Sequence, residues 1–307
     1  MLRQAAFIAK NKMLKGALHC HTTRSDGAGD PGDVIRLHKA NGYDFMALTD
    51  HRRYNYENFA PETDMTIIPG MEVDANFERA GGVHCLHIVC IGPAKEDGNG
   101  FEQDQRFESL KINDQLEMQP FLDMIHDNKN MTIYCHPQWS GTPTRDFDKL
   151  QGNFAMELWN SGCVIENELD VDNGLMLDDL NEDGHRLWGV AVDDGHPMEQ
   201  HCNGWVMVNA ENNINAILRA LKDGAFYAST GPEINDFRIE NGKAVVECSP
   251  CTSVVFRCGR TPTRVKEDPE GMITSAEETV RPHMPFIRAV VTDEMGNTAW
   301  TNPIFLD

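Results

Sequence analysis

The chain lacks the long apolar run of a membrane protein, the paired cysteines of a secreted disulfide scaffold and the basic excess of a protein that binds polyanions. No apolar run in its 307 residues approaches the roughly 18–20 residues of a membrane-spanning helix. Basic residues are scarce, with 27 lysines and arginines against 48 acidic residues, and the formal net charge of −21 disfavours non-specific binding to nucleic acid or anionic membrane. The nine cysteines are odd in number and scattered, which favours reduced thiols.

The N-terminal 16 residues also lack a secretion signal. They carry basic residues but no sustained apolar core and no clean cleavage site, so we expect mature protein and a cytoplasmic location. Cys248, Cys251 and Cys258 resemble part of a zinc knuckle, but a fourth ligand at fitting spacing is missing, so a structural zinc ion there is disfavoured.

Short apolar runs alternate with helical patterns from residue 15 to about 230. Strands are predicted at 15–18, 45–48, 66–68, 87–91, 131–134, 155–158 and 189–192, and helices at 33–40, 115–128 and 214–223. This alternation predicts a parallel α/β sheet, and the number of strands favours a barrel. Beyond Gly231-Pro232 the chain is β-rich, so we predict a barrel domain over 1–232 and a small β-sandwich over 233–307.

Side chains that can bind metal lie at the ends of nearly all the predicted barrel strands. His19 and His21 follow the first strand at a spacing that points both to the same side. The other strand ends supply Asp26, Asp50, His51, Glu72, His87, His136, Asp194 and His196. Each alone is more often a cap or a turn residue. Because strand ends converge at one mouth of a barrel, and buried imidazoles and carboxylates need compensation, the joint pattern predicts a metal site.

In their order, these motifs resemble the PHP (polymerase and histidinol phosphatase) superfamily. The resemblance rests on His19-x-His21, Ser25-Asp26-Gly27, Thr49-Asp50-His51, Pro69-Gly70-x-Glu72, His87, Cys135-His136-Pro137 and Asp194-x-His196. Segments 226–232 and 300–304 resemble a branch that includes carbaryl-hydrolase-like metallohydrolases.

The resemblance implies a distorted (β/α)7 PHP barrel with a trinuclear metal site. One metal would be held by His19, His21, Glu72 and Asp194, a second by Glu72, His87 and His136, and a third by Asp26, His51 and His196. Two or three divalent ions are expected, and this ligand mixture suits zinc, manganese or iron. His84 and His87 lie three residues apart, so a strand would direct them to opposite sides; we prefer His87 as the ligand.

Weaker expectations concern residues around the metals. Arg24 could contact a substrate anion, and His201 could bind substrate and protonate a leaving group, although both could be surface residues. Asp50 is expected to orient a ligand. Glu157 and Asn160 could either support the metal ligands or act as a plain helix cap. Trp139 either forms a wall of the pocket or belongs to the core.

The predicted function is a metal-dependent phosphoesterase that uses a metal-bridging hydroxide, with Glu72 and Asp194 in the catalytic centre. The expected partner is a small-molecule phosphate ester, with neither a nucleic acid polymer nor a membrane. The first alternative is hydrolysis of a carboxyl ester, carbamate or amide, because the same hydroxide can attack carbon. The second is a non-catalytic metal-binding or regulatory module, which the complete ligand set disfavours. The sequence indicates no oligomeric state.

Overall fold

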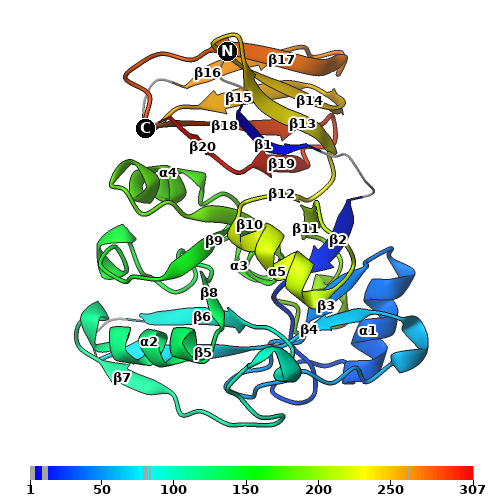
Figure 1. The fold of residues 1–307 in the computed structure, drawn as a ribbon, viewed down its shortest axis with the longest axis vertical. Helices are drawn as coiled ribbons and strands as arrows, with labels where there is room; N and C mark the ends of the chain where they lie inside the picture. Colours follow the sequence, from blue (N-terminus) through cyan, green and yellow to red (C-terminus); the bar gives the residue numbers. More distant parts are fainter. Residues whose placement is uncertain (1–3, 9–12, 79–81, 83, 261–262, 307) are drawn as a thin grey trace.

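The computed structural model of the protein describes residues 4–8, 13–78, 82, 84–260 and 263–306. Figure 1 shows a lower part in which helices surround strands, and an upper part made of strands. Within the described residues, no helix is both long enough and apolar enough to cross a bilayer.

The lower part is a distorted α/β barrel, which confirms the predicted fold class. Its strands are β2 (Leu14–Ala17), β3 (Phe45–Ala47), β4 (Thr66–Ile68), β5 (Gly70–Phe77), β6 (Cys85–Ile91), β7 (Leu110–Ile112), β8 (Met131–Tyr134), β9 (Asn153–Asn160) and β10 (Trp188–Val192). They form two arcs, β2-β3-β4 and β10-β9-β8-β6-β5-β7. Isolated bridges from Cys20 to Gly195 and from His51 to Glu72 join the arcs into a ring.

One barrel strand runs against the predicted parallel direction. Strand β6 pairs antiparallel with both β5 and β8, whereas β2-β3-β4 and β8-β9-β10 are parallel. The connection from Phe77 to Cys85 is too short for the crossover that a parallel neighbour requires. The first residues of β6 therefore lie at the mouth where the parallel strands end.

Helices cover the barrel, and Figure 1 shows α1, α2 and α4 on its outside. The helices are α1 (Pro31–Ala40), α2 (Gln119–Asp127), α3 (Ser161–Asn167), α4 (Gly174–Glu182) and α5 (Ile214–Lys222), with 3-10 turns η1 (Pro61–Thr63), η2 (Lys95–Asp97), η3 (Gln115–Glu117), η4 (Thr144–Asp146) and η5 (Met198–Gln200). The Asp30 side chain caps α1 by accepting from the Gly32 amide, and Asn213 caps α5 in the same way. Three predicted helices correspond to α1, α2 and α5, while α3 and α4 were not predicted.

The upper part is the expected β-rich region. Its strands are β13 (Ile234–Glu240), β14 (Lys243–Cys251), β15 (Ser253–Arg257), β16 (Arg264–Glu267), β17 (Ile273–Thr279), β18 (Phe286–Thr292), β19 (Thr298–Thr301) and β20 (Ile304–Phe305). One sheet has the order β1-β13-β14-β17, where β1 is Gln4–Ile8. Phe237, Val246 and Phe256 are fully buried in the core of this region.

The two parts are joined by strand pairing. The second sheet of the upper part continues from β19 through β12 (Phe226–Ser229) and β11 (Trp205–Val208) into barrel strand β2. The N-terminal strand β1 pairs with β13 of the upper part. The domain boundary between 232 and 233 stays a prediction, and the backbone hydrogen bonds run continuously across it.

Candidate metal centre

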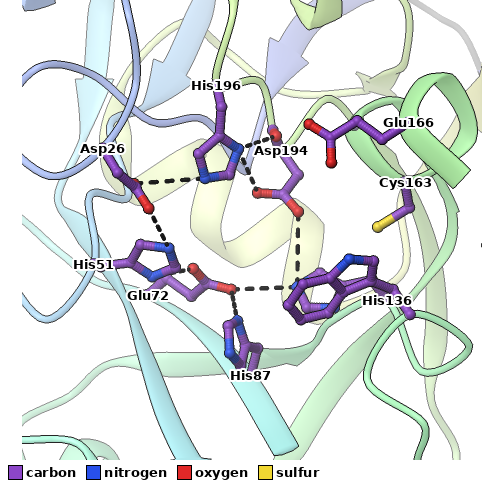
Figure 2. Close-up of a pocket in the computed structure, with 11 residues that line it drawn as sticks. Asp26, His51, Glu72, His87, His136, Cys163, Glu166, Asp194 and His196 are labelled. Carbon is purple, nitrogen blue, oxygen red and sulfur yellow. Dashed lines mark hydrogen bonds and ion pairs between the residues drawn. The ribbon is translucent and has the colours of Figure 1, made fainter. Parts of the chain in front are cut away.

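A pocket of about 260 Å³ opens at the barrel mouth, where the metal-binding side chains were expected (Figure 2). Its lining consists of Asp26, His51, Glu72, His87, His136, Trp139, Gly162, Cys163, Glu166, Asp194 and His196. His19 and His21 lie behind this lining and are fully buried. The structure thus brings together all nine proposed metal ligands.

The deepest group contains His19, His21, Glu72 and Asp194. Nε2 of His19 lies 3.4 Å from Glu72 Oε1 and 3.2 Å from Asp194 Oδ1. Nε2 of His21 lies 3.4 Å from Glu72 Oε2 and 3.0 Å from the same Asp194 oxygen. Two imidazoles and two carboxylates therefore face one point, as the i, i+2 spacing of His19 and His21 predicted.

Glu72 also faces a second pair of imidazoles. Its Oε1 lies 2.9 Å from His87 Nδ1 and 3.5 Å from His136 Nε2. His87 occupies the third position of β6 and reaches the mouth because that strand runs antiparallel. His84 lies outside the pocket lining, with its Nδ1 3.0 Å from the Gly141 carbonyl oxygen.

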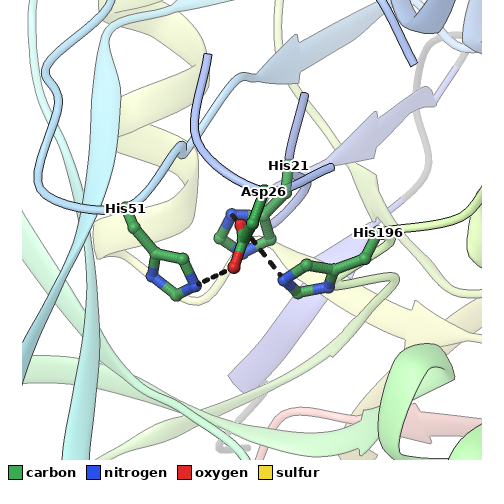
Figure 3. A group of neighbouring side chains, drawn as sticks. All are labelled: His21, Asp26, His51 and His196. Atoms are coloured by element: carbon green, nitrogen blue, oxygen red, sulfur yellow. Dashed lines mark ion pairs between the residues drawn. The ribbon is translucent and has the colours of Figure 1, made fainter. Parts of the chain in front are cut away.

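The third group contains Asp26, His51 and His196, and Figure 3 shows His21 beside them. Nε2 of His51 lies 3.4 Å from Asp26 Oδ2, and Nε2 of His196 lies 3.5 Å from Asp26 Oδ1. Nδ1 of His196 donates to the Asp194 carbonyl oxygen at 3.0 Å, which leaves Nε2 directed at Asp26. His21 Nδ1 lies 3.9 Å from Asp26.

The electrostatics match a site built for positive charge. Burial alone would raise the pKa of Glu72, yet the imidazoles of His87, His51 and His19 hold it well below its usual range. Burial would lower the pKa of His19, but Asp194 and Glu72 raise it well above its ordinary value. Without metal, the carboxylates are therefore ionised and imidazole protons supply the balancing charge.

The chemistry of the donor set fits a cation. Six imidazoles and three carboxylates converge on the mouth, and buried groups of these types need a compensating cation. His51 Nδ1 and Glu72 Oε2 lie 2.7 Å apart, the distance of a charge-assisted hydrogen bond, so a proton joins them in the metal-free protein. His136 and Asp194 also adopt positive φ angles of 24° and 48°, a backbone strain that is concentrated at functional sites.

Glu157 and Asn160 support the site from behind. Glu157 is fully buried, and its Oε1 lies 2.7 Å from His19 Nδ1, so that nitrogen donates and Nε2 faces Glu72 and Asp194. Asn160 Nδ2 donates to Asp194 Oδ2 at 3.1 Å and to Glu157 Oε2 at 2.9 Å, while its side-chain oxygen caps α3. Asn160 thus has both of the roles left open. A charged Glu157 inside an apolar strand was the sequence signal.

Asp50 orients the loop that follows the first pair of histidines. Its Oδ1 accepts from the Thr22 amide at 2.8 Å and from Ser25 Oγ at 2.9 Å, and both its oxygens accept from the Thr22 hydroxyl. Ser25 Oγ in turn lies 3.4 Å from His21 Nδ1. This arrangement agrees with the expected orienting role.

The structure does not bring the two proposed substrate-binding residues, Arg24 and His201, to the pocket lining. The Arg24 guanidinium is paired with Asp104 and lies 4.8 Å from the centre of the Phe59 ring. His201 is buried, with only 4% of its surface exposed. Burial and the neighbouring His38 lower the pKa of His201 to about 4. Neither residue has the access that its proposed role requires, because Arg24 is engaged by Asp104 and His201 is buried outside the pocket lining.

Sequence reasoning missed the wall that α3 contributes. Gly162, Cys163 and Glu166 line the pocket from this helix, and Figure 2 shows Cys163 and Glu166 opposite Asp26 and His51. Trp139 walls the pocket as well, with its ring centre 5.1 Å from that of His136. The short α3 has no long apolar periodicity, so its position beside the metal ligands left no signal in the sequence.

Part of the chain resembles known proteins in sequence. Residues 17–165 match the PHP domain family. A 5'-3' exoribonuclease of Haemophilus influenzae is 36% identical over 76 residues, which are 24% of this chain and 26% of the exoribonuclease. The chain therefore matches about a quarter of the length of that curated relative.

A solved structure from Bacteroides vulgatus covers this chain almost completely. It is a two-domain protein containing a predicted PHP-like metal-dependent phosphoesterase, and it aligns over 98% of both chains with 13% identity and a TM-score of 0.50. At that identity the match bears on the fold. The carbaryl-hydrolase-like branch is not confirmed by these matches and stays a prediction. In sequence over residues 17–165, and in fold over nearly its whole length, the chain is similar to PHP-type proteins.

Proposed function

We propose that the protein is a metal-dependent phosphoesterase with a trinuclear site, within the broader class of metal-dependent hydrolases that the comparisons support. The observation that carries the proposal is the position of Glu72. Its two oxygens lie within 3.5 Å of imidazole nitrogens from five histidines, namely His19, His21, His51, His87 and His136. A carboxylate so surrounded is suited to bridge cations.

In this proposal the nine ligands form three sets, and Glu72 belongs to the first two of them. His19, His21, Glu72 and Asp194 hold one ion; Glu72, His87 and His136 hold the second; and Asp26, His51 and His196 hold the third. Zinc, manganese and iron suit imidazole and carboxylate donors. Bound ions would supply a bridging hydroxide at neutral pH and would neutralise the charge of a phosphate group.

The remaining lining residues define what the protein itself contributes. None of the described lining residues is lysine or arginine, so a phosphate group depends on the ions for charge neutralisation. Glu157 and Asn160 hold His19 and Asp194 in place. Trp139, Cys163 and Glu166 form a mixed wall for the rest of a small substrate. We infer a small phosphate ester as substrate and, from nine free thiols, a cytoplasmic location.

A second candidate substrate is a nucleic acid. The exclusion of nucleic acid polymers is not supported, because the exoribonuclease relative acts on RNA by its name. A phosphodiester at the end of an oligonucleotide presents the same phosphate chemistry to the metals. The chain's strong negative charge favours the small ester. Hydrolysis of a carboxyl ester or carbamate remains the alternative favoured by the resemblance of segments 226–232 and 300–304.

The third ligand set provides a test between these chemistries. A phosphate has three non-bridging oxygens for three cations, whereas a carboxyl ester develops one oxyanion that two cations can stabilise. Asp26→Ala should therefore lower phosphoester cleavage much more than carboxyl-ester cleavage, and inorganic phosphate should inhibit competitively. Asp33→Ala, at an exposed position on α1, is the matched control and should change neither rate.

The comparison uses a phosphomonoester, a short single-stranded RNA and a carboxyl ester, at equal occupancy of the other two metal positions. Cleavage of esters or carbamates without any phosphoester cleavage, together with no inhibition by phosphate, would refute the phosphoesterase proposal. Cleavage of RNA in preference to the monoester would select the second candidate.

A further inference from the structure

Three buried side chains that the proposed reaction does not use lie together behind the metal centre. His38 belongs to α1, Asp193 directly follows β10, and His201 follows η5. The exposed fractions of their surfaces are 0%, 0% and 4%, and none of the three lines the pocket. One ligand atom from each lies within 4.8 Å of the other two.

The hydrogen bonds of His38 define its tautomer. Its Nδ1 lies 2.8 Å from the Val34 carbonyl oxygen, which can only accept, so Nδ1 carries a hydrogen. In the neutral ring, Nε2 then presents a lone pair, and that atom lies 3.4 Å from Asp193 Oδ2. Two acceptors facing each other in a dry interior require a cation between them, either a proton or a metal ion.

The distance between these two atoms favours the metal ion. A proton on Nε2 would make a charge-assisted hydrogen bond, for which about 2.7–2.9 Å is normal. Two ligands of a tetrahedral zinc ion, each bonded at about 2.0–2.1 Å, lie about 3.3–3.4 Å apart. The observed 3.4 Å matches the second geometry.

His201 supplies the third donor. Both of its ring nitrogens are buried and have no hydrogen-bond partner in the structure. A proton on His38 would leave both nitrogens unpaired, whereas a metal ion bound to His38 and Asp193 would engage one of them.

Asp193 is already held in the manner of a metal ligand. Its Oδ1 accepts from the amides of Asn203 and Gly204, both at 2.9 Å, and its Oδ2 accepts from the Cys202 amide at 2.8 Å. Such contacts fix a carboxylate for coordination.

We propose that His38, Asp193 and His201 form an additional, structural site for a divalent transition metal, with zinc as the best match. The two imidazoles and one carboxylate provide three ligands, and a water molecule would complete the tetrahedron. The site ties α1 to the segment from Asp193 to Gly204. That segment also carries Asp194 and His196, so the bound ion would hold two ligands of the proposed catalytic metals in register.

The direct test is diffraction from crystals of the full chain grown with zinc chloride. Anomalous difference maps recorded above and below the zinc absorption edge should show a peak within about 2.3 Å of His38 Nε2, Asp193 Oδ2 and a His201 nitrogen. A water molecule or no density at that position, while the mouth of the barrel holds zinc, would overturn the proposal.

Metal counting gives an independent test in solution. After dialysis against low zinc, His201→Ala and His38→Ala should each contain one equivalent less than the wild type. His126→Ala, which removes a half-buried imidazole bonded to Thr132, is the matched control and should lose none. Equal zinc content in all four folded proteins would contradict the site. This readout requires no substrate, so it stands or falls independently of the phosphoesterase proposal.

Discussion

At the scale of single residues, His84 and His87 form a natural matched pair. His87 Nδ1 lies 2.9 Å from Glu72 Oε1. His84, three residues before His87 in the chain, instead directs its Nδ1 at the carbonyl oxygen of Gly141. His87→Ala should remove one metal equivalent and lower the hydrolytic rate by about a hundredfold, since even supporting groups around metals change activity 10–100-fold. His84→Ala should change the rate less than about threefold. Metal content and rate are measured on both variants, and the opposite ranking would reverse the assignment.

The titrating imidazoles give a second prediction for single residues. Burial would lower the pKa of His196, but its bond to Asp26 raises that pKa to about 9. Burial would also lower the pKa of His87, but Glu72 raises it well above its usual value. At pH 7.5 these rings hold protons in the metal-free protein, and a metal ion must displace them. Metal affinity should therefore fall as the pH is lowered.

Calorimetry can measure the displaced protons. Zinc is titrated into metal-free protein at pH 7.5 in two buffers of different ionisation enthalpy. The difference between the two binding heats, divided by the difference between the ionisation enthalpies, should correspond to the release of more than one proton per chain. Identical heats in the two buffers would show that the rings are already neutral before metal binds, contrary to these pKa directions.

At the scale of secondary-structure elements, the junction of β9 and α3 connects a helix cap to the metal centre. Asn160 caps α3 through the Cys163 amide and also donates to Asp194. Asn213 caps α5 through the Ala216 amide, at the start of a helix that contributes no residue to the pocket lining. Both Asn160→Ala and Asn213→Ala should cost about 1 kcal/mol of unfolding free energy through the lost cap.

Only the first of these variants should weaken metal binding, by about tenfold or more, because Asp194 loses a donor that orients it. Urea unfolding and chelator competition provide the two readouts. Equal metal affinity in both variants would mean that Asn160 acts on the helix alone.

The elements also show what the sequence could and could not predict. The spacing of His19 and His21 after one strand, and the placement of His136 and Asp194 after two others, depend on local chain direction and could be predicted. Glu72 was expected beyond the strand at 66–68 and instead is the third residue of the next strand, β5. The antiparallel course of β6, the pairing of β1 with β13 and the α3 wall depend on contacts between distant segments. Arg24 and His201 were placed at the pocket because they follow ligand motifs, but loop packing turned them elsewhere.

At the scale of the whole molecule, three arginines of the upper part, Arg257, Arg260 and Arg288, form ion pairs with α4 of the barrel. Arg288 of β18 is fully buried and donates from Nε and Nη2 to the Asp178 carboxylate at 2.7 and 3.0 Å. Arg288→Ala should cost about 3 kcal/mol of unfolding free energy, because it leaves Asp178 buried with only Arg257 nearby.

The exposed Arg260 provides the control for this link. It pairs with Asp179 and Asp183 on and after the same helix, and Arg260→Ala should cost less than about 1 kcal/mol. Urea unfolding compares the two variants. Equal losses would indicate that the buried pair does not fasten the upper part to the barrel.

The central claim is that ions held at the barrel mouth drive phosphoester hydrolysis. The most direct measurement is phosphate release from a phosphomonoester by the purified full chain, before chelation, after removal of all metal, and after addition of manganese, zinc or iron. The account predicts that chelation abolishes release and that at least one of these metals restores it, with two or three ions bound at the mouth. Phosphate release that persists in fully metal-free protein, or a reloaded protein that cleaves only carboxyl esters, would contradict it.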